Sequence, residues 1–417
     1  MIRSKVKILV LNVHKKDGRS MNDFADFNAM RLMESFGGGR VFYFSDSVNN
    51  IGIRRTEEEI RRIIAEEGVS IVFFAPNGDS YELSIEFFKG LKKDLGVKCV
   101  LWVLDDEMIF DVMSKYYSQA FDAAVTTDYY ATFAYRKLGL PALYYFSSYL
   151  KADLHPVDVE RDIPVSFIGD CAKADRMEYI NYLRENGVDA RSFGDGSEKG
   201  FLSKAEVPAI YSRSKINLNF TKVDHAGPGS WFLADNALTN IIRQNKGRPM
   251  EIALTRSFCL SETSPSIGVV FEQGKEIDTF RCKEELLAKV NQYLKNDGVR
   301  ERIAEGAYRK AVSEYEAGVF FPALADRLCA VLDEGRYLPE CECIHKDPVF
   351  KKNQMIRLSI VMLYQMSRLK ALPAAETFKE LFRYGIIVFL SSFIRAIKIS
   401  FLKLVHKKRS RRHGLQK

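Results

Sequence analysis

The stretch Val165-Ser-Phe-Ile-Gly-Asp170 lies near the middle of the 417-residue chain and is decisive for its fold. An apolar run of strand length ends there in a glycine, and a helical pattern opens soon afterwards at Arg176. Apolar strands that alternate with helices are typical of a parallel sheet covered on both faces. The stretch therefore predicts the first strand of a doubly wound α/β domain.

The same alternation continues toward the C-terminus. We expect strands at 165–168, 190–193, 216–220 and 259–262, and helices at 176–186, 209–212, 283–294, 299–315 and 321–333. Together they predict a Rossmann-like domain over residues 164–335.

An earlier series of the same kind precedes this domain. We expect strands at 6–13, 41–45, 71–75, 99–104, 123–127 and 142–146, and helices at 21–35, 57–65 and 83–95. They predict a first Rossmann-like domain over residues 1–150, with a linker at 151–163. Two such halves place a cleft between the carboxyl ends of their sheets, where ligands of this fold class bind.

Composition agrees with a folded protein of more than one domain. Hydrophobic residues make up 47% and charged residues 28% of the chain. The seven cysteines are an odd number and lie mostly in apolar runs, which is typical of reduced thiols rather than of a disulfide framework. The N-terminus leads directly into a strand pattern without a signal region. We therefore expect a cytoplasmic protein.

The net charge of +8 is concentrated at one end of the chain. Nine basic residues and no acidic one lie between Arg395 and Lys417, so the rest of the chain is close to neutral. A near-neutral body argues against a nucleic-acid partner. Residues 336–417 are expected to form a helical extension, with helices at 352–370 and 376–405. Apolar and basic residues from Phe382 to Val405 predict a helix that lies on an anionic membrane, which truncation after Ala375 would remove.

Several motifs of the second half occur in the order seen in one enzyme family. They are Val165-Ser-Phe-Ile-Gly-Asp170, Ser192-Phe-Gly194, Lys215-Ile-Asn-Leu-Asn-Phe220, Arg248-Pro-Met-Glu-Ile-Ala253, Phe258-Cys-Leu-Ser-Glu262 and Phe271-Glu-Gln-Gly-Lys-Glu276. With this ordered set the chain resembles the spore-maturation (CgeB-like) glycosyltransferases, which are related to the retaining family-4-type enzymes. The resemblance covers residues 165–330 and extends more faintly into the first half through Trp102-Val-Leu-Asp-Asp106.

The resemblance implies a GT-B fold and the transfer of a sugar from a nucleotide-sugar donor, with UDP- or GDP-sugars expected. The acceptor would be a glycan, a lipid-linked molecule or a polymer in the synthesis of cell-surface polysaccharide or glycoconjugates. The sequence departs from the family at two places. Arg243 stands where a second glutamate usually precedes the one matched by Glu251, and Thr255-Arg256-Ser257 replaces a glycine.

Arg248 and Glu251 are the first candidates for donor binding. Pro249 suits the first turn of a helix, so Arg248 is expected to open one at the cleft. A guanidinium there would offset the charge of a diphosphate, and the Glu251 carboxylate would accept hydrogen bonds from both ribose hydroxyls. The alternative for Glu251 is simple compensation of the helix dipole.

Four further residues are candidates for the donor side: Gly169, Lys173, Arg176 and Gly194. Gly169 lets the chain turn after its strand, so that Lys173 or Arg176 could reach a phosphate; a solvated helix start explains them equally well. Gly194 could bring the backbone close to the base, or simply form a turn.

The first half supplies three candidate catalytic residues: His14, Asp105 and Asp106. Each follows a predicted strand at the end that faces the cleft. His14 could orient the donor or assist proton transfer from an acceptor hydroxyl, and either aspartate could accept that proton. For the two aspartates the alternative is a turn or a helix cap before Met108.

Neither a metal nor a cofactor other than the donor is expected. Cys341-Glu-Cys343-Ile-His345 has tight spacing and lacks a fourth ligand nearby, and no Asp-x-Asp motif follows a suitable strand. Two other functions remain open. One is a sugar-nucleotide epimerase on the same scaffold, and the other is a non-catalytic nucleotide- or glycan-binding protein of polysaccharide assembly.

Overall fold

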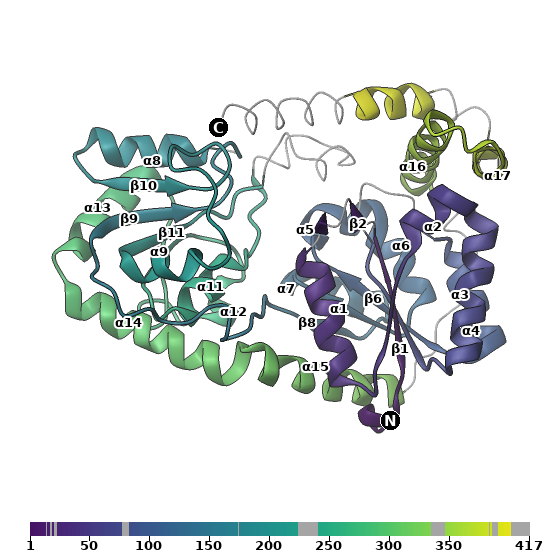
Figure 1. The fold of residues 1–417 in the computed structure, drawn as a ribbon, viewed down its shortest axis with the longest axis horizontal. Coiled ribbons are helices and arrows are strands. Elements are labelled where there is room, and N and C mark those ends of the chain that lie inside the picture. Colours follow the sequence, from purple (N-terminus) through teal and green to yellow (C-terminus); the bar gives the residue numbers. More distant parts are fainter. Residues whose placement is uncertain are drawn as a thin grey trace. The chain divides into compact units, whose positions relative to one another are not determined.

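The structure is a computed structural model, and it describes residues 1–13, 15–16, 19–20, 23–76, 83–173, 175–223, 241–334, 347–382, 384–385 and 391–401. The described chain forms two compact units (Figure 1). The first contains Met1–Tyr144 and the described residues from Phe321 onward, and the second contains those between Tyr145 and Phe320.

The first unit is built on a parallel six-stranded sheet with the order β4-β1-β5-β6-β7-β8. Its strands are β1 (Ile8–Asn12), β4 (Gly39–Tyr43), β5 (Ile71–Phe74), β6 (Lys98–Val103), β7 (Ala123–Thr126) and β8 (Ala142–Tyr144). All residues of β1, β5 and β7 are buried, as expected for strands covered on both faces. A separate short hairpin pairs β2 (Lys15–Lys16) with β3 (Arg19–Ser20).

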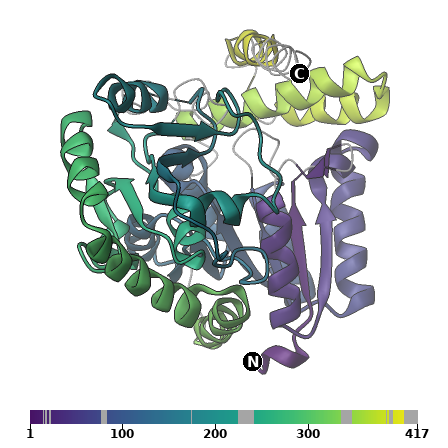
Figure 2. The ribbon, with the colours of Figure 1, turned by 60° about the vertical axis from the view of Figure 1, so that its left-hand side comes forward.

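Helices cover both faces of this sheet, with α1 on one side and α3 and α4 on the other (Figures 1 and 2). The helical segments before residue 144 are α1 (Asp23–Ser35), α2 (Phe44–Ile51), α3 (Ile53–Glu67), α4 (Ile85–Leu95), α5 (Asp106–Ile109), the π-helix η2 (Phe110–Ser114), α6 (Lys115–Tyr117) and α7 (Tyr129–Lys137), with short 3-10 turns η1 (Arg3–Lys5) and η3 (Ser118–Ala120). Local signals fix their ends. The Ser84 hydroxyl accepts from the Phe87 N–H at the start of α4, and Gly96 closes that helix with φ 66°.

The second unit has a parallel five-stranded sheet with the order β10-β9-β11-β12-β13. Its strands are β9 (Ile163–Ile168), β10 (Ala190–Phe193), β11 (Ser214–Asn219), β12 (Cys259–Glu262) and β13 (Asp278–Phe280), and its helices are α8 (Arg176–Glu185), α9 (Val207–Arg213), α11 (Arg248–Leu254), α12 (Ile267–Val270), α13 (Lys283–Leu294), α14 (Asp297–Lys310) and the π-helix η5 (Ala311–Tyr315). Val165 and Phe167 of β9 pack in one core cluster with residues of α8 and α13. Ile168 belongs to another cluster, with Ile210 of α9.

Helix α15 (Ala317–Asp333) corrects the predicted end of the second domain. From Phe321 onward it belongs to the first unit. Its residues contact the N-terminal region there: the Phe27 and Phe321 rings lie 6.2 Å apart, and Arg3 Nε lies 2.8 Å from Asp326 Oδ1. The first unit also ends at Tyr144 rather than at residue 150, so the predicted linker belongs to the second unit.

Helices α16 (Pro348–Ser367) and α17 (Ala371–Phe382) are part of the first unit rather than a separate extension. They share a core cluster with Val48 of α2. The buried Gln365 side chain links all three helices, because its amide donates to the Val48 carbonyl at 2.9 Å and accepts from the Thr377 hydroxyl at 2.8 Å.

The predicted helix at 376–405 is interrupted in the structure. Helix α17 begins earlier and ends at Phe382, and residues 384–385 are not helical. A separate helix covers 391–401. None of the helices in the described part of the chain has the length and apolar character needed to cross a bilayer.

Candidate functional site

Four segments of the second unit meet where its strands end. Strand β9 ends just before Gly169, β10 ends just before Gly194, β11 ends at Asn219, and α11 begins at Arg248. Because parallel doubly wound sheets bind their ligands outside the carboxyl ends of the strands, this edge is the expected place for a ligand.

The two strand-end glycines pack backbone against backbone. A Cβ atom on Gly194 would lie 2.3 Å from the Gly169 carbonyl oxygen, and its φ of 108° is one that other residues rarely adopt. A Cβ atom on Gly169 would lie 2.5 Å from Nη2 of Arg248 and 2.9 Å from the Phe167 ring. The Ser197 N–H donates to the Gly194 carbonyl at 3.2 Å, so Gly194 begins a turn. Contact with a nucleotide base stays a prediction.

Arg248 lies across these strand ends. Its guanidinium carbon is 4.8 Å from the centroid of the Phe167 ring, and Nη1 donates to the Asn219 side-chain oxygen at 2.9 Å. Within the described residues, no carboxylate forms an ion pair with it. The half-buried arginine is therefore fixed in direction, and among the described residues its charge has no carboxylate partner.

Glu251 is held by two tyrosines from other parts of the unit. The Tyr149 hydroxyl donates to Oε1 and the Tyr211 hydroxyl donates to Oε2, each at 2.9 Å. Burial, reinforced by the charge of Glu251, raises the pKa of both phenols well above the ordinary value of 10.0. Both tyrosines are therefore protonated donors, and they fix the carboxylate of a side chain that is partly exposed.

Gly247 explains how one of these phenols comes so close. A Cβ atom at this position would lie 2.1 Å from the Tyr149 hydroxyl oxygen and 2.8 Å from Oγ of Ser147. The residue before α11 must therefore be small for Tyr149 to reach Glu251.

Lys173 and Arg176 have local roles in the structure. Arg176 is buried, donates from Nη1 to the Asp170 carbonyl at 2.7 Å, and lies 5.6 Å from the Phe167 ring centroid. Through this hydrogen bond Arg176 holds the loop that follows β9. Lys173 lies on the surface, with Nζ 3.5 Å from Oδ2 of Asp170. The structure brings both residues to the loop of Gly169; phosphate contact by either one stays a prediction.

Arg243, which replaces the usual second glutamate, pairs with a buried carboxylate. Its Nε lies 2.8 Å from Oε1 of Glu262, a residue that is 2% exposed at the end of β12. The other oxygen of Glu262 accepts the backbone N–H groups of Thr221 and Lys222 at 2.8 and 3.0 Å. The positive charge of Arg243 is therefore paired with the buried Glu262 carboxylate. Through Glu262, the segment that follows β11 is linked to the end of β12.

The candidate catalytic residues of the first unit differ in their surroundings. His14 lies outside the described residues. Asp105 is exposed at the end of β6. Asp106 is 2% exposed, and both of its oxygens accept the Tyr135 hydroxyl, at 2.9 and 3.1 Å. Burial raises the pKa of Asp106 to about 6. Asp106 thus anchors α7 inside the unit, and only Asp105 presents its carboxylate to solvent.

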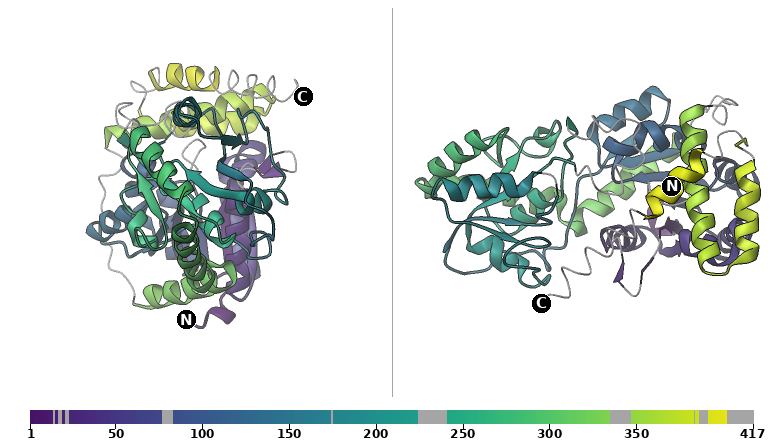
Figure 3. Two further views of the ribbon diagram at one scale, coloured as in Figure 1. Left: turned by 90° about the vertical axis from the view of Figure 1, so that its left-hand side faces the viewer. Right: turned by 90° about the horizontal axis from the view of Figure 1, so that it is seen from above.

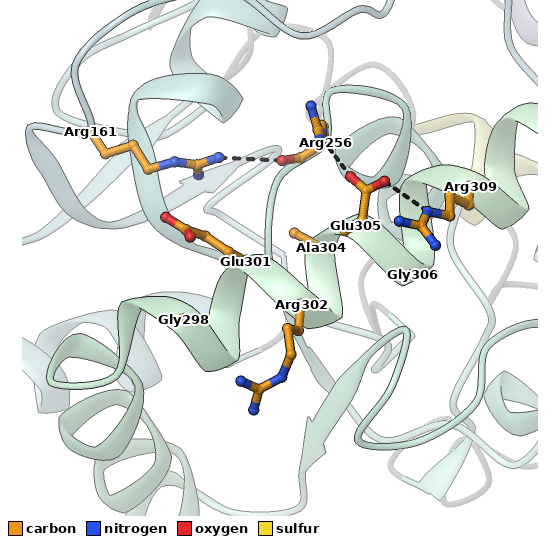
Figure 4. Close-up of a pocket in the computed structure, with 9 residues that line it drawn as sticks. All are labelled: Arg161, Arg256, Gly298, Glu301, Arg302, Ala304, Glu305, Gly306 and Arg309. Atoms are coloured by element: carbon orange, nitrogen blue, oxygen red, sulfur yellow. Dashed lines mark hydrogen bonds and ion pairs between the residues drawn. The ribbon is translucent and has the colours of Figure 1, made fainter.

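A hollow of about 680 Å³ lies at the other end of the second sheet (Figure 4). Its lining includes Arg161, whose guanidinium donates to the carbonyls of Ser214, the first residue of β11, and of Arg256, shortly before β12. Figure 4 shows Glu305 pairing with both Arg256 and Arg309, at 2.5 and 2.8 Å. The hollow is thus at the amino ends of the strands and contains ion-paired charges, so it is separate from the candidate site.

The described residues contain no group of three or more His, Cys, Asp or Glu side chains that could hold a metal. The sequence Cys341-Glu-Cys343-Ile-His345 lies outside them.

Known proteins can now be compared with this geometry. Residues 176–318 match the protein-family model described as glycosyl transferase-like. This segment includes Gly194, Asn219, Arg248 and Glu251. No curated protein matches the chain.

Solved structures extend the likeness to both units. Sucrose-phosphate synthase from Thermosynechococcus elongatus superposes with a TM-score of 0.58 at 8% identity, over 79% of this chain and 100% of that one. Anabaena HepE, solved in complex with UDP, gives 0.57 at 10% identity, over 78% and 100%. A glycosyltransferase from Rickettsia africae gives 0.56 at 10% identity, over 79% and 99%.

The chain has the GT-B fold. At these identities the likeness concerns the fold, and it confirms the predicted pair of Rossmann-like domains. The finer resemblance to the spore-maturation type stays a prediction.

The sequence predicted the charged residues of the candidate site, and it gave no role to the residues that contact them in the structure: Asn219, Tyr149, Tyr211 and Glu262. Asn219 had a usable signal, because it is a polar residue at the carboxyl end of a predicted strand. The two tyrosines had none, since they lie 102 and 40 positions from Glu251 in the chain.

Proposed function

We propose that this protein is a glycosyltransferase that takes its sugar from a nucleotide-sugar donor bound at the strand ends of the second unit. One observation carries the proposal. Arg248 and Glu251 lie three positions apart in the first turn of α11. Among the described residues, the Arg248 guanidinium has no carboxylate partner, and two phenols fix the Glu251 carboxylate.

The guanidinium suits the donor diphosphate. A bound diphosphate carries negative charge, which grows on the departing oxygen as the bond to the sugar breaks. Arg248 is oriented in advance by Asn219 and Phe167, so it needs little reorganisation to form charge-assisted hydrogen bonds. Gly169 and Gly194 have no Cβ atom, which lets Arg248 and the Gly169 carbonyl pack closely against them at this edge.

The carboxylate suits the ribose diol. Each oxygen of an ionised carboxyl group has two lone-pair positions. Tyr149 and Tyr211 use one position on each oxygen of Glu251. With the partners found among the described residues, one position on each oxygen remains, which matches two adjacent hydroxyl donors.

The proposed reaction breaks the bond between the sugar anomeric carbon and the β-phosphate oxygen, and the nucleoside diphosphate leaves with the electron pair. A new bond forms between the anomeric carbon and an acceptor hydroxyl oxygen, and the hydroxyl proton passes to a base. In the first unit we favour Asp105 over Asp106, because Asp106 is buried and bonded by Tyr135. Asp105→Asn should lower turnover without weakening donor affinity.

We further infer a UDP- or GDP-sugar donor, a hexosyl or related group, and transfer without a metal. Anabaena HepE, with the same fold, has been solved with UDP and with UDP-glucose, which supports testing UDP first. A glycan, a lipid-linked molecule or a polymer is the proposed acceptor, at the cytoplasmic face of the cell membrane.

Isothermal titration with UDP, GDP and CDP tests the donor site. Glu251→Gln removes a charged acceptor and should cost about 1.5–3 kcal/mol of nucleotide affinity, with turnover at saturation little changed. Arg248→Ala should lower both nucleotide affinity and turnover, because the diphosphate that Arg248 is proposed to bind gains negative charge in the transition state. Glu301→Gln and Arg302→Ala, at the opposite end of the sheet, are matched controls. Wild-type nucleotide affinity in Glu251→Gln would mean that the donor site is elsewhere.

Two other functions predict different results in an activity assay. An epimerase would convert the nucleotide sugar without an acceptor and release no nucleoside diphosphate. A non-catalytic binding protein would bind the nucleotide sugar and neither hydrolyse nor transfer it. Measuring nucleoside diphosphate release with and without acceptor separates all three.

A further inference from the structure

The C-terminal helices of the first unit expose an unusual number of large apolar side chains. Helices α16 and α17 and the helix at 391–401 lie together along one side of this unit (Figures 1 and 3). Their exposed apolar residues include Met366, Leu369, Leu372, Phe382, Ile394, Ile397 and Phe401. We call this set the C-terminal apolar surface.

The turn between α16 and α17 places its leucine outward at a conformational cost. The Lys370 N–H donates to the Gln365 carbonyl at 2.9 Å, and the Leu369 N–H donates to the Met366 carbonyl at 3.0 Å. This is the Schellman pattern, whose first residue after the helix cap is usually glycine. Here it is Leu369, with φ 56° and a side chain that is 92% exposed. Neither backbone preference nor packing accounts for a leucine at this position.

The helix at 391–401 is apolar on two sides. Ala396 and Ile399 are buried in a cluster with Ile356 of α16, so this side fixes the helix to the unit. Ile394, Ile397 and Phe401 recur at helical spacing and face solvent, with Ile394 and Phe401 67% and 64% exposed. A helix that needed only to dock on the protein would carry polar residues on that second side.

Charge around the surface is predominantly basic. From Tyr364 to Phe401 the described residues include five basic side chains, Arg368, Lys370, Lys379, Arg395 and Lys398, and two acidic ones, Glu376 and Glu380. The chain then continues for sixteen residues, 402–417, that contain seven Lys or Arg and no Asp or Glu. Apolar side chains flanked by positive charge match the headgroup region of an anionic bilayer.

We propose that the C-terminal apolar surface docks the first unit on an anionic phospholipid bilayer, with the α16–α17 turn and the outer side of the 391–401 helix inserted among the headgroups. The basic tail predicted from the sequence is then one part of the contact, and helices built into the core of the unit provide the rest. The inference does not depend on the donor site, whose residues lie in the second unit.

Sedimentation of the full chain with vesicles tests the proposal. Vesicles of phosphatidylcholine with one-third phosphatidylglycerol should bind it, and vesicles of phosphatidylcholine alone should bind it much more weakly. Leu369→Ser with Leu372→Ser, and separately Ile394→Ser with Phe401→Ser, should each weaken binding by roughly tenfold or more. Met30→Ser with Phe133→Ser removes comparable exposed apolar residues from α1 and α7 and should leave binding unchanged.

Leu369→Gly separates a docking role from a structural one. Glycine fits the positive φ, so this variant should unfold at a higher temperature and yet bind vesicles less tightly. A chain that ends at residue 401 should lose part of the binding and keep its dependence on Leu369.

Three results would overturn the proposal: equal binding to neutral vesicles, unchanged binding in both serine pairs, or a concentration-dependent dimer that the serine pairs abolish while vesicle binding stays absent. The last result would assign the surface to a second copy of the chain. Nucleotide affinity measured on the same samples is a separate readout, because its loss would concern the donor site.

Discussion

At the scale of single residues, the candidate site depends on side chains that orient other side chains. Glu251 and Arg248 are each held by neutral partners: two phenols for the carboxylate and an amide with an aromatic ring for the guanidinium. Neutral partners fix direction without cancelling charge. An ion pair between the two residues would have satisfied both and left neither for a ligand.

The tyrosines that hold Glu251 give the first residue-scale prediction. Tyr211→Phe leaves Oε2 without its donor, so the carboxylate can rotate and the nucleotide affinity should fall by about 1 kcal/mol. Tyr149→Phe should do the same through Oε1. Tyr293→Phe is the matched control, because its hydroxyl donates to Asp278 at 2.7 Å elsewhere in this unit. Titration calorimetry measures the nucleotide affinity of each variant. An equal loss of affinity in all three would mean that the loss comes from general destabilisation of the unit and not from Glu251.

Asp106 gives a prediction about pH. Burial raises its pKa from 3.8 to about 6, so the folded first unit binds this proton more tightly than the unfolded chain does. Its contribution to stability is therefore complete below pH 3.8 and is lost as the pH rises through 6. Asp106→Asn removes this dependence, so the stability of the variant relative to wild type should increase between pH 4 and 7, by on the order of 3 kcal/mol.

Urea unfolding at several pH values measures this difference. The chain has two tryptophans, Trp102 and Trp231, and Trp102 lies in β6 of the first unit. In a Trp231→Phe background, Trp102 fluorescence therefore reports on the unit that contains Asp106. Asp111→Asn, at a highly exposed position of the same unit, should show no such dependence. A stability difference that is flat with pH for Asp106→Asn would contradict the raised pKa.

At the scale of elements, helices and strands with a regular apolar pattern were predictable from the sequence. Short elements and elements without such a pattern were not. The strands at 190–193 and 259–262 and the helix at 283–294 have the predicted bounds. Strand β13 was missed because it has three residues, two of them polar, which is too short for a recognisable pattern. Helix α7 was missed because aromatic and β-branched residues are weak helix formers, and its signal is the Asp128 cap on the Tyr130 N–H.

The candidate site follows the same rule. Glycines and charges at strand ends can be identified from the sequence, because their place follows from the topology of parallel sheets. Partners such as Tyr149 become visible only after folding brings separate segments together. The boundary at α15 escaped prediction for a similar reason, since which unit Phe321 packs against depends on tertiary contacts.

Helix α17 gives the element-scale prediction. A chain ending at Ala375 loses Thr377, whose hydroxyl donates to Gln365, and Leu381, which is 2% exposed in the core. Its first unit should be destabilised by more than about 3 kcal/mol, mostly through the cavity left by Leu381. A chain ending at Gly385 keeps both residues and loses the packing of Ala396 and Ile399 on Ile356, so it should be destabilised less than the chain ending at Ala375. Urea unfolding of the two chains tests this, and equal stability would show that α17 is dispensable.

At the scale of the whole molecule, the two proposals fall on different units. The proposed donor residues lie between Gly169 and Glu251, in the second unit, and the C-terminal apolar surface lies in the first. The fold of the structural neighbours likewise comprises both units, whereas the family match from 176 to 318 falls almost wholly in the second. Ligands for the two surfaces should therefore stabilise different parts of the chain.

Hydrogen exchange measured by mass spectrometry tests this separation in the intact protein. At a hundred times its dissociation constant, UDP stabilises the folded state that binds it by about 2.7 kcal/mol. Exchange should slow in peptides covering 167–173, 192–197 and 247–254, and stay unchanged in 348–382. Vesicles containing phosphatidylglycerol should slow exchange in 364–382 and 391–401 and leave the strand-end peptides unchanged. Glu251→Gln should remove only the first effect, and the serine pair at Leu369 and Leu372 only the second. Protection of α16 and α17 by UDP, or of the Gly169 loop by vesicles, would contradict the assignment of the two surfaces to separate units.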